Sequence, residues 1–172
     1  MKKIILLGYM GSGKSTTAKT LGKALLLPTY DLDQLIEAEC QSSISNIFLE
    51  RGEIFFRKKE QEIFQKLLQA PESFVLSLGG GTPCYANNHL LLNQEQLVSV
   101  YLKASIPTLL SRLANDSNNR PILAQNTEEP LESFIAKQLF ERSYFYHHAQ
   151  HTIKVDQKDV ATITEEIISL LA

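Results

Sequence analysis

The chain has 172 residues, which is the size of one ordinary domain with a single large core. Hydrophobic residues make up 44% and charged residues 21%, so the disordered and collagen-like classes are excluded. The formal net charge is −2, and no apolar run approaches the roughly 20 residues of a membrane span. We therefore expect neither nucleic acid nor a membrane as a partner.

The N-terminus and the two cysteines indicate where the protein works. The apolar run at residues 4–7 follows Lys2 and Lys3, but it is too short for a secretory signal and no small-residue cleavage site follows it. Cys40 and Cys84 have no CxxC pattern and no histidine at metal-ligand spacing, which favours reduced thiols over a structural disulfide. We expect a cytoplasmic protein that acts as a monomer.

Short apolar runs alternate along the chain with longer amphipathic stretches. The runs predict strands at residues 3–7, 29–31, 74–78, 98–102 and 152–155. The stretches predict helices at residues 14–26, 33–40, 44–69, 86–92, 106–114, 130–148 and 158–171. Five strands joined by helical crossovers predict an α/β fold, with a parallel sheet covered by helices on both faces. Ligands of such sheets bind at the carboxyl ends of the strands.

Residues 8–16, GYMGSGKST, fit the P-loop pattern G-x-x-x-x-G-K-[ST] at every fixed position. The glycines let successive backbone N–H groups point into one concavity, and the next helix adds its own free N–H groups, which together bind phosphate oxygens. Lys14 would reach the β and γ phosphates, and the Ser15 hydroxyl would ligate Mg²⁺. The alternative is a glycine turn that only joins strand to helix, but every element of the required context is present. The predicted nucleotide-binding residues are Gly11, Ser12, Gly13, Lys14, Ser15 and Thr16.

Two carboxylates follow the second predicted strand. Asp31 and Asp33 are two residues apart, and strand alternation alone would turn both side chains to one side. Asp31 is a candidate partner of Mg²⁺, either directly or through water, and Asp33 is a candidate general base for a substrate hydroxyl. A helix N-cap is the alternative role for Asp33, because it precedes a helical stretch.

Charged residues also fall on the apolar stripes of two predicted helices. Arg57 and Glu60 lie on the stripes that continue through Phe64, and Arg142 lies three residues before Phe145. A charge on a core-facing stripe needs a partner. Arg57 and Glu60 could satisfy each other as a buried pair, or Arg57 could point into a cleft and bind an anion while Glu60 holds it. We favour the cleft, and the second core-side arginine, Arg142, also suggests an anionic ligand.

Two loops complete the candidate site. The third predicted strand ends in Gly79, Gly80 and Gly81, so a ligand can approach the backbone closely, and a flexible turn is the alternative. The polar segment from residue 114 to 130 lacks helical or strand periodicity and is typical of a lid. Arg120 within it would clamp the transferring phosphate, unless its charge is incidental to a mobile loop.

These landmarks occur in one order: GYMGSGKST (8–16), DLDQLI (31–36), IFLERGEIFFRKKE (47–60), GGG (79–81), NRPIL (119–123) and ERSYFYHHA (141–149). With them the chain, from residue 3 to about 155, resembles the shikimate kinases of the nucleoside-monophosphate-kinase-like P-loop family. The P-loop is shared by many nucleotide-binding proteins, whereas the ordered set of D-x-D, F-R-x-x-E, G-G-G and R-P-[LI] is specific. The departures are Ile122, where leucine is usual, and an extended segment at 124–129.

The resemblance implies a three-layer P-loop kinase fold in one domain, 1–172, with a substrate-binding helical region at about 33–60 and a mobile lid at about 114–130. It implies transfer of the γ-phosphoryl group of ATP to the 3-hydroxyl of shikimate, in aromatic amino-acid biosynthesis. Its other implications concern single residues. Shikimate would be held by Asp33, Arg57, Gly79, Gly80, Gly81 and Arg142, and ATP, Mg²⁺ and the moving phosphoryl group by Lys14, Ser15, Asp31 and Arg120, with Arg112 and one of residues 156–158 near adenine.

Two other functions fit parts of the sequence. A related small-molecule kinase, such as a gluconate kinase, shares the P-loop and the size. A non-catalytic module that binds nucleotide as a switch needs only the P-loop. Arg57 and Arg142 beside Asp33 argue against both, because together they suit a compact carboxylate that bears vicinal hydroxyls.

Overall fold

The computed structural model describes residues 2–115 and 128–172. The predicted lid at 114–130 lies mostly outside the described residues, and Arg120 lies outside them entirely. The prediction of a mobile lid therefore stays a prediction.

Five parallel strands form one sheet in the order β2-β3-β1-β4-β5. Their bounds are Lys3–Leu7 for β1, Thr29–Asp31 for β2, Phe74–Ser77 for β3, Leu97–Lys103 for β4 and His151–Lys154 for β5. The central strand β1 is buried along its whole length, which explains its continuous apolar run. The predicted parallel α/β sheet is confirmed.

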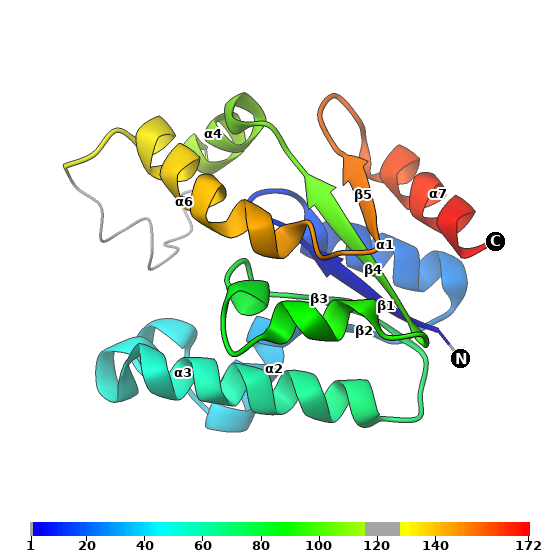
Figure 1. The fold of residues 1–172 in the computed structure, drawn as a ribbon, viewed down its shortest axis with the longest axis horizontal. Coiled ribbons are helices and arrows are strands. Elements are labelled where there is room, and N and C mark those ends of the chain that lie inside the picture. Colours follow the sequence, from blue (N-terminus) through cyan, green and yellow to red (C-terminus); the bar gives the residue numbers. More distant parts are fainter. Residues whose placement is uncertain (1, 116–127) are drawn as a thin grey trace.

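Helices cover both faces of this sheet (Figure 1). They are α1 (Lys14–Leu25), α2 (Leu32–Cys40), α3 (Ile44–Gln69), α4 (Ile106–Ala114), α6 (Leu131–Tyr146) and α7 (Val160–Leu171), with two 3₁₀ helices, η1 (Thr82–Cys84) and η2 (Asn88–Asn93). Helices α1 and α7 pack together on one face, while α3, η2 and α6 lie across the other. The change of face follows from the strand order, because right-handed crossovers that run in opposite directions from β1 and β2 place their helices on opposite faces.

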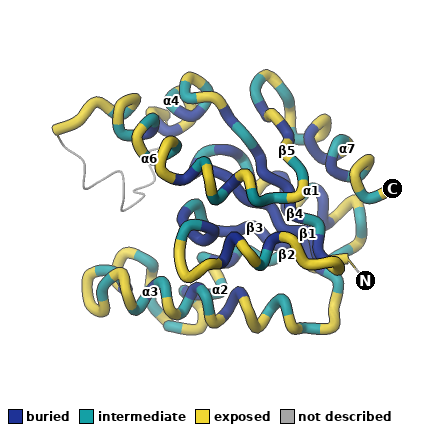
Figure 2. The backbone as a smooth tube through the Cα atoms, viewed as in Figure 1, coloured by how far each residue is buried: buried dark blue, intermediate teal, exposed yellow. Residues whose placement is uncertain are grey.

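The buried residues gather in the strands and in the helix faces that meet them (Figure 2). Tyr9, Phe64, Phe74 and Tyr146 are the largest side chains that are fully buried among the described residues. Two of these four, Tyr9 and Tyr146, lie beside the carboxyl ends of the strands rather than in the middle of the core. The core therefore reaches up to the edge where ligands of such folds bind.

Two helical segments differ from the prediction. The stretch expected as a helix at 86–92 is the short 3₁₀ helix η2, because Ala86 and Asn87 adopt left-handed backbone with φ of 52° and 57°. An α-helix cannot begin before these residues, and only six residues remain for η2. Helix α3 has the expected bounds, but Gly52 inside it is non-helical with φ 81° and ψ 172°, so its first two turns are set at an angle to the rest.

The close packing of α1 on β2 depends on Gly22. A Cβ at this position would lie 1.9 Å from the Thr29 hydroxyl oxygen and 3.0 Å from the Leu27 carbonyl oxygen. In an exposed helix, glycine to alanine stabilises by about 1 kcal/mol. Here we expect Gly22→Ala to destabilise by about 2 kcal/mol, because the helix must move away from the strand. Urea unfolding measures the change.

The double variant Gly22→Ala with Thr29→Ala is the control. It removes the closest clashing atom, so it should recover part of the lost stability. A Gly22→Ala protein as stable as the wild type would contradict the predicted close approach.

Candidate active site

A cavity of about 770 Å³ opens where the strands β1, β2 and β3 end. The α/β sheet rule predicts a ligand site at this edge. Its lining includes every described residue that the sequence predicts for the site: Gly11, Ser12, Gly13, Lys14, Ser15, Thr16, Asp31, Asp33, Arg57, Gly79, Gly80, Gly81, Arg112 and Arg142. The fold thus brings together residues that are up to 131 positions apart in the chain, from Gly11 to Arg142.

The P-loop between β1 and α1 depends on backbone that other residues rarely adopt. Gly8, Gly11 and Gly13 have φ of 148°, 83° and 92°, and Gly13 is the N-cap of α1. The Lys14 ammonium group is buried and donates to the carbonyl oxygens of Gly8 at 2.8 Å and Tyr9 at 3.0 Å. The loop therefore holds a cation at the positive end of a helix, an arrangement suited to a polyphosphate.

The residues at the start of α1 and the end of β2 fit a magnesium ion. The Ser15 hydroxyl donates to Asp31 Oδ2 at 2.7 Å. Asp31 Oδ1 accepts from the backbone N–H groups of Asp33 and Gln34, so Asp31 is the N-cap of α2. A hydroxyl and a carboxylate are the hard oxygen donors that Mg²⁺ takes when substrate phosphates and water supply its remaining ligands.

Asp33 lies in the first turn of α2, so strand alternation does not explain why it faces the cavity with Asp31. The alternative role of N-cap belongs to Asp31. A Cβ on Gly79 would lie 3.0 Å from Asp33 Oδ1, so the glycine gives this carboxylate its space. Burial raises the pKa of Asp33 to about 6, and the negative charges of Asp31 and Glu60 add to the increase, while Lys14 and Arg57 oppose it.

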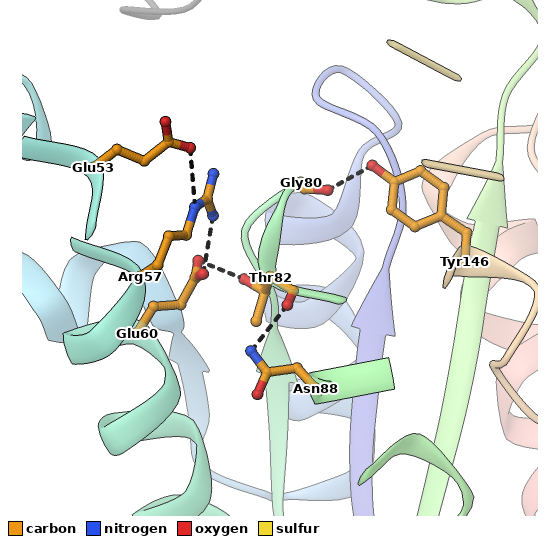
Figure 3. Close-up of polar contacts among 7 residues, drawn as sticks. All are labelled: Glu53, Arg57, Glu60, Gly80, Thr82, Asn88 and Tyr146. Carbon is orange, nitrogen blue, oxygen red and sulfur yellow. Dashed lines mark hydrogen bonds and ion pairs between the residues drawn. The ribbon is translucent and has the colours of Figure 1, made fainter. Parts of the chain in front are cut away.

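Arg57 is held on several sides (Figure 3). Its Nη1 lies 2.9 Å from Glu60 Oε1, and its Nε lies 3.6 Å from Glu53 Oε1. Its guanidinium group stacks 3.9 Å from the ring centroid of Tyr85. Glu60 is 1% exposed, and its second oxygen accepts from the Thr82 hydroxyl at 2.8 Å. Arg57 pairs with buried Glu60 and also lines the cavity, so the structure combines the ion pair of one alternative with the cleft position of the other. Binding of an anion by Arg57 stays a prediction.

The glycine loop after β3 lies between the two arginines. A Cβ on Gly81 would lie 2.7 Å from Arg57 Nη2, and one on Gly80 would lie 3.4 Å from Arg142 Nη1. The same Cβ on Gly80 would lie 3.6 Å from the backbone nitrogen of Met10 in the P-loop. The absence of side chains here lets both guanidinium groups come against the loop backbone.

Arg142 points inward from α6 and is 8% exposed. Its guanidinium carbon lies 5.7 Å from the ring centroid of Tyr9, whose hydroxyl donates to Gln138 of the same helix at 2.6 Å. Among the described residues, the buried Nη1 atom of Arg142 has no hydrogen-bond partner. A buried guanidinium nitrogen with an unused donor beside a cavity is suited to an anionic ligand.

The residues predicted near adenine lie at separate places around the P-loop end of the cavity. Arg112 donates from Nη1 to the Gly11 carbonyl oxygen at 2.9 Å, so it contacts the P-loop directly. Asp156 accepts from the hydroxyls of Ser105 and Thr108, which ties the loop after β5 to the start of α4. Of residues 156–158, only Lys158 lines the cavity.

Sequence reasoning missed several residues of this site. Thr82 and Asn88 extend the Glu60 network, since Asn88 Nδ2 donates to the Thr82 carbonyl oxygen at 3.0 Å. Phe48 and Phe56 form one wall of the cavity, with ring centroids 4.7 Å apart. The apolar stripe of α3 is consistent with a core role for Phe56, and Phe48 lies in the first turns of that helix, before the non-helical Gly52.

Comparisons with known proteins agree with these observations. The family model described as shikimate kinase matches residues 10–172. The chain is 52% identical to the shikimate kinase of Flavobacterium johnsoniae over 172 residues, which is the full length of both chains. Among solved structures it is similar to the shikimate kinase of Bacteroides thetaiotaomicron, with a TM-score of 0.89 and 32% identity over 98% of this chain and 97% of that chain.

Two further structures help to separate fold from function. A shikimate kinase from Acinetobacter baumannii, solved in complex with shikimate, gives a TM-score of 0.87 at 30% identity and covers 98% of this chain and 92% of that one. A gluconokinase from Sinorhizobium meliloti gives 0.64 at 18% identity, covering 98% and 90%. The likeness to the gluconokinase shows a shared fold and nothing about function.

The raised pKa of Asp33 predicts that Asp33→Asn stabilises the protein at neutral pH. An unfolded aspartate loses its proton near the ordinary value of 3.8, whereas the folded protein keeps it until about pH 6. The folded state therefore binds more protons between these values and loses stability as the pH rises through this window. We expect the variant to be more stable than the wild type by about 3 kcal/mol at pH 7.

Urea unfolding of both proteins at several pH values checks this. The difference between them should shrink steadily from pH 7 toward pH 4, where the wild-type carboxyl group is neutral when folded. A difference that stays constant with pH would show that the side chain acts through packing and not through its charge.

Proposed function

The chain belongs to the shikimate kinase family, and we propose from the geometry of its site how it transfers the γ-phosphoryl group of ATP to the 3-hydroxyl of shikimate. The products are shikimate 3-phosphate and ADP. The observation that carries the proposal is the pair of inward arginines, Arg57 and Arg142, on either side of one glycine loop and in the same cavity as the P-loop. A module that only bound nucleotide would have no use for this pair.

ATP would bind at the P-loop end of the cavity. The N–H groups of residues 11–16 would surround its phosphates, and the Lys14 ammonium would leave the carbonyl oxygens of Gly8 and Tyr9 for the β and γ phosphates. Ser15 and Asp31 would hold Mg²⁺, and Arg112 would lie near adenine. When bound, the metal ion would neutralise the negative charge that develops on the phosphates.

Shikimate would bind at the other end. The carboxylate of shikimate would pair with the guanidinium groups of Arg57 and Arg142, and the backbone of residues 79–81 would lie against the ring. Asp33 would accept a hydrogen bond from the reacting hydroxyl and take its proton as the oxygen attacks phosphorus. Since phosphoryl transfer depends mainly on positioning and electrostatics, holding the hydroxyl in line matters more than strong basicity.

Other parts of the proposal concern the whole chain. We propose that residues 1–172 form one kinase domain, that residues 33–60 form its substrate-binding helical region, and that the segment 114–130 is the lid. Arg120 in that segment would stabilise the transferring phosphoryl group. Among the helices that the structure describes, none has the length and apolar character needed to cross a membrane. We also propose that the protein works as a monomer in the cytoplasm.

Coupled ADP release with ATP and Mg²⁺, with and without shikimate, tests the activity. We expect strong stimulation by shikimate in the wild type. Arg142→Ala should lower kcat/KM for shikimate by about a hundredfold, because a buried partner of the carboxylate is lost, while ATP binding is retained. Lys137→Ala is the matched control, since Lys137 is an exposed cation of the same helix. Stimulation by gluconate, or by neither compound, would contradict the proposal.

Gly81→Ala tests the role of the glycine loop without removing a charge. The backbone at residue 81 is in the ordinary α-helical region, so alanine itself fits there, but its Cβ must displace the Arg57 guanidinium group. We expect KM for shikimate to rise about tenfold while KM for ATP stays unchanged. Gly80→Ala should be milder, because its Cβ would lie 3.4 Å from Arg142. Equal effects on both substrates would argue against a local displacement of Arg57.

A further inference from the structure

The hydroxyl of Tyr146 joins the helix that carries Arg142 to the glycine loop. Tyr146 is the last residue of α6 and is fully buried. Its hydroxyl donates to the Gly80 carbonyl oxygen at 2.6 Å, as Figure 3 shows. Because Tyr146 follows Arg142 by four residues, the two side chains lie on one face of the helix.

The same hydroxyl also meets the arginine. The Arg142 side chain lies close enough to the phenol for its charge and its N–H groups to favour the ionised form of Tyr146, and a guanidinium group can only donate to the phenol oxygen. Burial raises the pKa of Tyr146, although the Arg142 charge opposes the increase. The phenol therefore keeps its proton, which it donates to the Gly80 carbonyl oxygen, and its own oxygen faces a group that can only donate.

The guanidinium group of Arg142 thus lies beside the phenol and keeps an unused donor. Arg142 Nη1 is buried and has no hydrogen-bond partner among the described residues. It lies 3.4 Å from where a Cβ on Gly80 would stand, and Gly80 is the residue whose carbonyl oxygen Tyr146 holds. One hydroxyl thus holds the loop backbone beside which the arginine lies.

We propose that Tyr146 is a positioning residue for carboxylate recognition. It holds the Arg142 guanidinium group and the Gly80–Gly81 peptide in one arrangement before the substrate arrives. The carboxylate then meets a preformed donor, and less binding energy is lost to ordering of the arginine side chain. This inference rests on the proposed binding of the shikimate carboxylate by Arg142.

Tyr146→Phe tests the hydroxyl alone, because the ring keeps its place in the core. We expect KM for shikimate to rise about tenfold, as for the loss of a hydrogen bond to a charged group. The carboxylate is remote from the reacting hydroxyl, so kcat should change less than about threefold, and KM for ATP should not change. Retention of kcat also shows that the variant folds.

Tyr101→Phe is the matched control. Tyr101 lies on β4, is 3% exposed, and packs its ring 5.1 Å from the ring of Tyr146. The variant removes a phenol hydroxyl from the same cluster of rings without touching Arg142 or Gly80, and we expect both KM values to stay as in the wild type. A rise in KM for shikimate equal to that of Tyr146→Phe would overturn the proposal, since the effect would then come from packing.

A substrate analogue separates positioning from general weakening. The carboxamide of shikimate keeps the ring and the hydroxyls but lacks the negative charge. The wild type should prefer the acid strongly over the amide, and Tyr146→Phe should reduce this preference about tenfold. A loss of affinity that is equal for acid and amide would overturn the role of Tyr146.

The wild-type result distinguishes failure of the proposed carboxylate site from failure of the proposed role of Tyr146. If the wild type does not respond to shikimate, or does not distinguish the acid from the amide, the proposed carboxylate site itself fails. If the wild type distinguishes them and Tyr146→Phe does so equally well, only the role of Tyr146 fails.

Discussion

The bare backbone of Gly79, Gly80 and Gly81 is the constraint on which the rest of the site depends. Asp33, Arg57 and Arg142 approach from three different helices, and each lies where a Cβ of one of these glycines would meet or crowd it. Charged groups can be buried at this density only if they pair with one another or with the backbone. Because the loop has no side chains, the carboxylate and the two guanidinium groups can occupy the space beside its backbone.

Glu60 shows how such a charge is maintained in the folded protein. Its carboxylate is 1% exposed and is shared between the Arg57 guanidinium group and the Thr82 hydroxyl. Asn88 in turn holds the Thr82 carbonyl oxygen, so α3, η1 and η2 are joined by one chain of hydrogen bonds. Removing one member would leave an unpaired buried group, which costs more than the bond itself contributes. The network keeps Arg57 at the cavity and away from solvent.

The sequence could predict the architecture because local signals and the fold agree. The predicted strands lie within about two residues of the observed ones, since each buried strand is an apolar run bounded by turn residues or charges. The P-loop was also predictable, because its residues fit a fixed pattern. The two arginines and the glycine loop were predictable because a charge on a core-facing stripe needs a partner, and because three glycines after a strand leave the backbone open to a ligand. Arg57 and Glu60 show the limit of this prediction. The sequence presents a buried ion pair and a position at a cleft as alternatives, whereas Arg57 pairs with Glu60 and also lines the cavity.

The rest depends on contacts that no local pattern encodes. Asp33 faces the cavity as expected, but for a different reason. It lies in the first turn of a helix that Asp31 caps, so the alternation of side chains along a strand does not apply to it. Tyr146 looks like an ordinary core aromatic in the sequence, and only the tertiary approach of α6 to the glycine loop gives its hydroxyl a partner, the Gly80 carbonyl oxygen. Of the two left-handed residues that shorten η2, Asn87 is of a type that tolerates this backbone, whereas Ala86 carries no such signal in the sequence.

The raised pKa of Asp33 joins the architecture to the chemistry. Burial and the neighbouring carboxylates of Asp31 and Glu60 favour its neutral form, whereas Lys14 and Arg57 favour its charge, and the balance puts its pKa at about 6. A carboxyl group with an ordinary pKa would be a weaker proton acceptor, and one with a much higher pKa would be protonated at neutral pH. In the proposed complex, a substrate hydroxyl that donated to Asp33 would favour the charged form, while exclusion of water around it would favour the neutral one. The glycine loop matters for this pKa because its bare backbone leaves room in one cavity for Asp33 and for the arginines whose charges act on it.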